Sequence, residues 1–227
     1  MVYPKRCISC GSPLPHDNTQ YACVTCWNSI ERIGENSCAG CSAPLAYQAD
    51  SCPACQRRPV SYGRLYAAAL YRGLMRRYLH RIKFSNKKYI MQALAHLCIT
   101  RCRQIPHMHT YDAVIPVPLH PARMRERGFN QAEILGKFIA DEFSIPLITG
   151  LLVRVRNTNP QFNLTLEKRK QNIQNAFNVT KQAAMSKYKK IILVDDICTT
   201  GSTLSEAARA LKSAGSKKIT CFVLAKD

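Results

Sequence analysis

The sequence predicts an α/β protein in which a central, mostly parallel sheet follows a small cysteine-rich domain. Eight of the twelve cysteines lie in the first 55 residues. From residue 64 onward, strand-like and helix-like segments alternate, and this alternation is typical of a parallel sheet covered by helices. The length of 227 residues leaves room for one ordinary domain and one small one, and the hydrophobic content of 46% is that of a globular protein.

Composition also predicts where the protein works and what it binds. No apolar run approaches the ~20 residues that span a bilayer, and the N-terminal residues 1–7 lack the apolar stretch of a signal peptide. We therefore expect a cytoplasmic protein without a membrane span. In a reducing cytosol, so many cysteines indicate metal binding or chemistry and not disulfides. The formal net charge of +19 indicates a polyanionic partner, such as nucleic acid, phosphorylated metabolites or an acidic membrane surface.

The N-terminal cysteines form four Cys-x-x-Cys pairs, separated by 12, 11 and 10 residues. Structural zinc takes four tetrahedral thiolate or imidazole ligands, so two such turns complete one site. We therefore predict a double zinc ribbon over residues 1–58, with two structural zinc ions. Sequential pairing gives one site from Cys7, Cys10, Cys23 and Cys26 and a second from Cys38, Cys41, Cys52 and Cys55. A cross-brace that interleaves the pairs is the alternative, and iron–sulfur clusters are disfavoured because their motifs are spaced differently.

The next region is strongly basic: residues 51–111 contain 12 Lys and Arg and no Asp or Glu. Alternation predicts a strand over residues 64–71, and helical periodicity predicts helices over 74–83 and 87–103. On the first helix, basic side chains lie on or near one face, namely Arg76, Arg77, Arg81 and Lys83. The region also contains aromatic residues that can stack on bases, namely Tyr62, Tyr66, Tyr71, Tyr78 and Phe84. This region is a candidate surface for single-stranded DNA. The alternatives are a helix face that is merely solvated and aromatic residues that pack in the core, since several of them have core periodicity.

The remaining elements complete a second domain over residues 60–227. Strands are predicted over 113–117, 191–194 and 219–225, and helices over 130–143 and 202–214. The continuous apolar run Ile191–Val194 indicates a strand that is covered on both faces. Residues 119–130 and 154–166 are expected to form loops, and Cys98 and Cys102 are expected to pack in the core.

Two acids and a hydroxyl-rich loop connect the strand 191–194 to the helix 202–214. Asp195 and Asp196 come directly after the apolar run. Thr199, Thr200, Gly201, Ser202 and Thr203 then lead into the helix. A loop of this kind can hold a phosphate at a helix N-terminus. The two carboxylates can accept hydrogen bonds from sugar hydroxyls and support Mg²⁺, directly or through water.

This stretch resembles the phosphoribosyl-pyrophosphate (PRPP) motif of type I phosphoribosyltransferases: four apolar residues, two acids and a Thr-Thr-Gly loop. With the cysteine pairs and the run Arg127-Gly128-Phe129-Asn130-Gln131-Ala132, the whole chain resembles the ComF family of competence proteins, also called GntX-like. The resemblance implies a phosphoribosyltransferase-type, Rossmann-like central parallel sheet behind the double zinc ribbon.

The resemblance also implies a ligand. PRPP with magnesium is expected at Asp195, Asp196 and the loop 199–203. Residues 119–130 are expected to face the pyrophosphate, where the guanidinium groups of Arg123, Arg125 and Arg127 suit its oxygens. Solvation of these arginines is the alternative. Residues 154–166 are expected to close over the site.

The family is implicated in natural transformation, so the implied partners are single-stranded DNA and DNA-processing proteins of the transformation machinery. The first hypothesis is a protein that handles incoming single-stranded DNA and has a magnesium–PRPP site. The alternative is an active phosphoribosyltransferase with an unidentified nucleobase or other nitrogen acceptor, although no residue stands out as its general base. A third hypothesis is a scaffold whose ribbons dock a DNA-processing protein.

Overall fold

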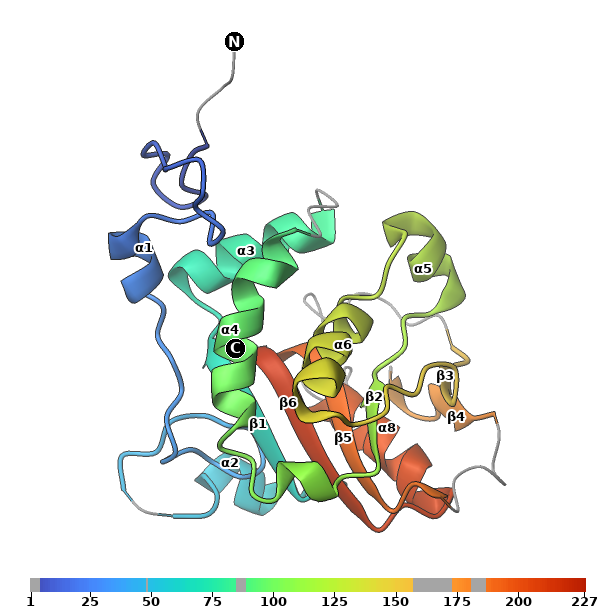
Figure 1. Ribbon diagram of the computed structural model, residues 1–227. Coiled ribbons are helices and arrows are strands. Elements are labelled where there is room, and N and C mark those ends of the chain that lie inside the picture. The colour runs from blue at the N-terminus through green and yellow to red at the C-terminus, as the bar shows by residue number, and fades with distance from the viewer. Residues whose placement is uncertain (1–4, 48, 85–88, 157–172, 181–186) are drawn as a thin grey trace.

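The computed structural model describes the chain apart from residues 1–4, 48, 85–88, 157–172 and 181–186. At its centre lies a four-stranded sheet in the order β1-β6-β5-β2, and all of its strand pairs are parallel (Figure 1). A short antiparallel pair, β3–β4, lies beside it. The strands are β1 Arg64–Leu70, β2 Ala113–Pro116, β3 Leu152–Arg154, β4 Phe177–Val179, β5 Lys190–Cys198 and β6 Lys218–Lys226. The predicted α/β class with a parallel sheet is confirmed.

Helices cover both faces of the sheet (Figure 1). The longer ones are α3 Gly73–Phe84, α4 Ile90–Cys102, α6 Gln131–Phe143 and α8 Ser202–Ser213. Shorter helical segments are α1 Val24–Asn28, α2 Pro53–Arg57, η1 Met108–Thr110 and α5 Pro121–Arg127. Within the described parts of the chain, none of the helices has the length and apolar character of a membrane span.

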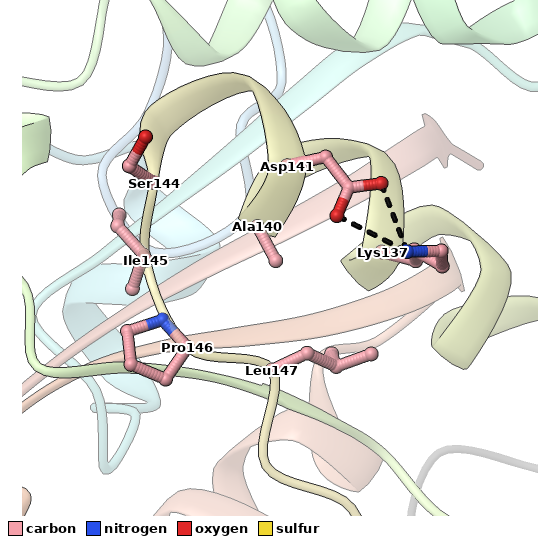
Figure 2. A pocket seen from close by; sticks show the side chains of 7 residues that line it. All are labelled: Lys137, Ala140, Asp141, Ser144, Ile145, Pro146 and Leu147. Carbon is pink, nitrogen blue, oxygen red and sulfur yellow. Dashed lines mark hydrogen bonds and ion pairs between the residues drawn. The ribbon is translucent and has the colours of Figure 1, made fainter.

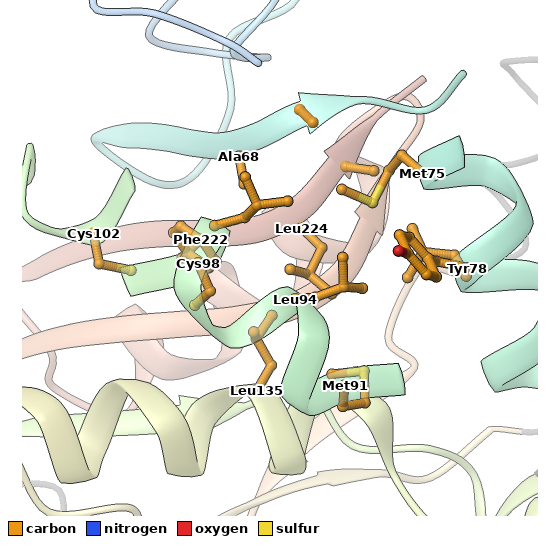
Figure 3. Packing of buried hydrophobic residues seen from close by; sticks show 14 of the residues in the cluster. Ala68, Met75, Tyr78, Met91, Leu94, Cys98, Cys102, Leu135, Phe222 and Leu224 are labelled. Carbon is orange, nitrogen blue, oxygen red and sulfur yellow. The ribbon is translucent and has the colours of Figure 1, made fainter. Parts of the chain in front are cut away.

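Side chains alternate across the central strands, as a pleated sheet requires. Ile192 and Val194 of β5 join a buried cluster with α3, α4 and α6, whereas Ile191 and Leu193 join a second cluster with α8. Figure 3 shows the first cluster, in which residues of three helices and two strands meet: Ala68, Met75, Tyr78, Met91, Leu94, Cys98, Cys102, Leu135, Phe222 and Leu224. Cys98 and Cys102 are fully buried there, which confirms that they pack in the core.

Two predicted boundaries were wrong. The stretch 119–130 is not a loop throughout, because it contains α5. Pro121 opens this helix, the His120 ring accepts a hydrogen bond from the amide of Ala122 at 3.3 Å, and Gly128 ends it with φ +75°. Strand β5 continues to Cys198 and includes both acids, because β6 runs alongside it over its whole length.

The predicted closing loop lies partly outside the described residues, which omit 157–172. Its first residue, Arg154, belongs to β3 and pairs with Phe177 of β4. The helix predicted over 87–103 begins at Ile90 in the part that the structure describes.

Both ribbons pack against the α/β part of the chain. In the first ribbon, Trp27 meets Tyr78 of α3 edge to face, with ring centroids 6.4 Å apart, and the Tyr78 hydroxyl donates to the carbonyl of Gln20. The segment that joins the two ribbons lies along the outer edge of β1. The amide of Leu70 donates to the carbonyl of Glu31 at 2.8 Å, and the amide of Ile33 donates to the carbonyl of Ala68 at 3.1 Å. The edge strand is therefore capped by the backbone of this segment.

Candidate functional site

Four cysteine sulfurs converge in each ribbon. The two groups are Cys7, Cys10, Cys23 and Cys26, and Cys38, Cys41, Cys52 and Cys55, and within each group all sulfurs lie within 4.8 Å of one another. This is the sequential pairing, and the cross-brace was the wrong alternative. The Cys10–Cys23 and Cys41–Cys52 sulfurs are 3.7 and 3.8 Å apart, and tetrahedral zinc with Zn–S bonds of ~2.3 Å needs about this separation. The donor sets therefore fit two structural zinc ions.

The two acids of β5 face opposite sides of the sheet. Asp195 follows the alternation of Ile191 and Leu193 and lies on the α8 side, whereas Asp196 follows Ile192 and Val194 and lies on the α3 side. Asp196 Oδ2 is 2.8 Å from Lys83 Nζ, and their side chains are 12% and 22% exposed. This largely buried ion pair ties the C-terminal turn of α3 to the carboxyl end of β5.

Asp195 is held in an environment that disfavours its charge. Burial raises the pKa of Asp195 to about 7, and the neighbouring charge of Asp196 adds to the rise. The amide of Asp196, Lys83 and Arg154 lower the pKa of Asp195, but they do not offset this effect. A cation or a hydroxyl donor that bound at Asp195 would favour the ionised carboxylate.

The hydroxyl-rich loop lies at the N-terminus of α8, as the sequence predicts. Gly201 precedes the helix with φ +79°, a conformation that L side chains rarely adopt. The Thr200 and Ser202 hydroxyl oxygens are 2.9 Å apart, and the Lys226 ammonium donates to the carbonyl of Thr199 at 3.1 Å. The loop 199–203 thus brings hydroxyls and helix-end amides next to the end of β5, where a phosphate can bind.

The predicted pyrophosphate arginines lie on α5 and do not all face the same way. Arg127 donates to the side chain of Gln131 at 2.8 Å, and Arg125 is exposed. Arg123 lies within electrostatic reach of Arg154: burial is the main cause that lowers the pKa of Arg154, Arg123 lowers it further, and Asp195 raises it. Arg154 is therefore close enough to interact electrostatically with both Arg123 and Asp195.

Two basic residues near the acids, Arg154 and Lys83, were not predicted from the sequence to lie beside Asp195 and Asp196. Arg154 was expected in a loop, and Lys83 was grouped with the basic face of α3. The sequence signal for Lys83 was its position at the end of a predicted helix, but only the fold shows that this end meets β5. Arg76 and Arg77 are exposed and Arg81 is partly exposed.

Most of the candidate stacking aromatics are not available to bases. Tyr62, Tyr66 and Tyr78 are buried, which excludes them as stacking rings and confirms the alternative that aromatics of this region pack in the core. The structure shows instead an accessible pair from the first ribbon and the start of α4. The Tyr21 and Tyr89 rings are 4.5 Å apart, Tyr89 is 40% exposed, and Lys5 lies over the Tyr21 ring.

An open hollow of about 440 Å³ lies at the C-terminal end of α6 (Figure 2). Lys137 and Asp141 form an ion pair at its rim, and apolar groups such as Ile145 and Leu147 line the rest. A crossover helix runs antiparallel to its strands, so this end of α6 lies near the amino ends of the strands, whereas the acid pair lies at their carboxyl ends. We therefore do not include this hollow in the candidate site.

Comparisons with known proteins bear on both parts of the chain. A family profile described as a double zinc ribbon domain matches residues 1–56, and one described as a phosphoribosyl transferase domain matches residues 130–227. The chain is 32% identical over 224 residues to Competence protein F of Haemophilus influenzae, which covers 97% of this chain and 96% of that protein.

It is also 27% identical to DNA utilization protein YhgH of Escherichia coli K12, over 99% of this chain and 98% of that protein. Among solved structures, orotate phosphoribosyltransferase from Aeropyrum pernix matches 67% of this chain and 64% of its own, with 19% identity and a TM-score of 0.37.

Proposed function

Because the chain belongs to the ComF family of competence proteins, we propose that it handles incoming single-stranded DNA in natural transformation and binds magnesium and PRPP. The observation that carries the proposal is the position of α3. This helix has exposed arginines along its length and ends with Lys83 next to Asp196. A basic surface therefore adjoins a phosphate-binding type of loop. The names of the relatives, Competence protein F and DNA utilization protein, point to the same process.

In this proposal the acid pair and the loop 199–203 bind PRPP. Asp195 and Asp196 hold the ribose hydroxyls and support Mg²⁺, directly or through water, and the ion neutralises pyrophosphate charge when it is bound. The loop amides and hydroxyls hold the phosphate. Arg154, which interacts electrostatically with Asp195, contacts the pyrophosphate, and Arg123 lies within electrostatic reach of Arg154. Lys83 adds a further positive charge at this end of the sheet, beside Asp196.

The DNA surface in this proposal combines α3 with the first ribbon. Arg76, Arg77 and Arg81 supply phosphate contacts, and Arg77 also donates to the carbonyl of Ser9 at 3.1 Å, which fixes the ribbon against the helix. Tyr89, which is exposed, and Tyr21, which is partly buried, supply the rings on which bases stack. The first ribbon then contributes both structure and contact area.

Fluorescence anisotropy with labelled single-stranded DNA tests the surface. Arg76→Gln with Arg81→Gln is expected to weaken binding about tenfold and to reduce the slope of log affinity against log salt by about 1.4, since each phosphate contact on single strands contributes ~0.7. The matched control is Lys212→Gln with Lys217→Gln, which removes the same charge from exposed positions of α8 and the turn after it. Equal losses in both doubles would show that net charge alone governs binding and would count against this surface.

The second candidate function is transfer of phosphoribose to a nitrogen acceptor, with release of pyrophosphate. Its support is the complete set of two acids, Thr-Thr-Gly loop and nearby cations. His120 is not a convincing general base, because its ring accepts from the Ala122 amide and caps α5. Pyrophosphate release measured across a panel of nucleobases is expected to stay at the level of an Asp195→Asn control. Release well above that control with any one base would favour the transferase.

A further inference from the structure

Tyr62 lies between the second ribbon and the PRPP-type loop. Its ring is buried, with 4% exposure, and its hydroxyl donates to the carbonyl of Gly40 at 2.6 Å. The same hydroxyl oxygen would lie 2.9 Å from a Cβ placed on Gly201. One side chain therefore contacts the turn between Cys38 and Cys41 and also packs against the residue that precedes α8.

The neighbours of Tyr62 hold the same two regions together. The amide of Ser61 donates to Ser205 Oγ at 3.0 Å, and the amide of Ser205 donates to the carbonyl of Gly201 at 2.8 Å. On the other side, the amide of Leu65 donates to the carbonyl of Ala39 at 2.8 Å. Residues 61–65 thus connect the ribbon turn to the first turn of α8 through direct hydrogen bonds.

The Gly40 carbonyl owes its position to the metal ligands around it. A Cβ on Gly40 would lie 2.8 Å from Cys55 Sγ, so the turn packs directly against a sulfur of its own cluster. Without a bound cation, burial and the neighbouring sulfurs raise the pKa of Cys41 to about 11, so this sulfur is a protonated thiol. No metal bonds then hold the four sulfurs together, and the turn would open. Opening would move the carbonyl that accepts from Tyr62.

We propose that Tyr62 is a positioning residue that couples the second zinc site to the PRPP loop, so that zinc at Cys38, Cys41, Cys52 and Cys55 sets the conformation of Gly201. The inference rests on the proposed PRPP site. Coupling between two binding events is reciprocal, so PRPP must also hold this zinc ion more tightly. The first zinc site has no such contact with the loop among the described residues, since its ribbon packs on α3 and Tyr78.

Zinc release to a coloured chelator, with and without saturating PRPP and Mg²⁺, tests the coupling in the full-length protein. Wild type is expected to release one of its two zinc ions about fivefold more slowly when PRPP is present, and the other at an unchanged rate. Tyr62→Phe keeps the ring and removes the hydroxyl. We expect it to abolish the protection and to weaken PRPP binding about fivefold, which is the effect of one buried hydrogen bond.

Tyr78→Phe is the matched control, because Tyr78 is an equally buried tyrosine whose hydroxyl donates to the first ribbon. It is expected to leave the PRPP protection intact. PRPP that binds wild type, measured by calorimetry, without slowing zinc release would overturn this inference and leave the proposed function standing. Loss of protection in both tyrosine variants would also overturn it, because general destabilisation would then explain the result. No PRPP binding by the zinc-loaded wild type would overturn both.

Discussion

Asp195→Asn is expected to abolish PRPP binding and at the same time to stabilise the fold at pH 8. The carboxyl of Asp195 has its pKa raised from 3.8 to about 7, mainly by burial and next by Asp196. A group that is costly to ionise in the folded state, yet lies beside the proposed PRPP loop, is typical of a binding site that trades stability for function. Asparagine keeps the shape of the side chain and removes the charge.

The sign of the pH dependence follows from where the proton is held. Between pH 4 and pH 7 the folded protein keeps a proton on Asp195 that the unfolded chain has lost, so the free energy of unfolding falls as pH rises through this window. Above the folded-state pKa of about 7, this decrease in the free energy of unfolding reaches its full size. Asp195→Asn has no such decrease, so it should exceed wild type by about 2–4 kcal/mol at pH 8 and by little at pH 4.

Urea unfolding of both proteins at pH 4.5, 6 and 8 measures this difference. Asp196→Asn is the matched control, because it makes the same change one residue later but leaves the Lys83 ammonium without the carboxylate 2.8 Å away. It is expected to destabilise the protein by about 3 kcal/mol at pH 8, because removing one charge of a buried ion pair leaves the other charge buried without a partner. If Asp195→Asn were less stable than wild type at pH 8, Asp195 would be a structural acid and the ligand assignment would lose its main support.

The metal centres were predictable from the sequence because their ligands are close in the chain. A Cys-x-x-Cys turn presents two sulfurs by itself, so only the pairing of turns depended on the fold. The burial of Leu74, Tyr78 and Ile82 was predictable for a similar reason, since helical spacing alone places them on one face.

Contacts between distant segments were not predictable. Lys83 and Asp196 are 113 positions apart, and nothing local in either segment shows that α3 ends beside β5. The opposite orientations of Asp195 and Asp196 depend on β5 continuing past its apolar run, which in turn depends on pairing with β6 as far as Lys226. The role of α5 was missed because the run from Pro121 is rich in charge and short, so it has no apolar face that would show helical periodicity.

Removing residues 1–59 is expected to make the remaining 60–227 insoluble, although the sequence pattern divides the chain there. In the whole protein the segment between the two ribbons pairs with β1 through hydrogen bonds to Ala68 and Leu70, and in the second ribbon Ser42 Oγ accepts from the amide of Ala67 at 2.9 Å. Without these contacts, β1 would become an open edge strand with a buried-type sequence, which is a template for association between chains.

The truncation would also remove a large amount of buried apolar surface. Trp27, Ile30 and Ile33 of the ribbons are at most 9% exposed, and at about 1.5–3 kcal/mol each they contribute roughly 5–9 kcal/mol, comparable with the 5–15 kcal/mol by which whole proteins are stable. The measurement is the soluble fraction and the sedimentation profile of the truncated chain beside two full-length variants.

Cys52→Ser, which breaks the second zinc site, is expected to aggregate like the truncation, because it loosens the ribbon that caps β1. Cys23→Ser breaks the first site but leaves the β1 contacts in place, so it should be destabilised and still remain monomeric. A monomeric, folded 60–227 would contradict this account, since it would show that the sheet needs no ribbon at its edge. The aggregation of both cysteine variants to the same extent would show instead that zinc acts on overall stability and not on this edge.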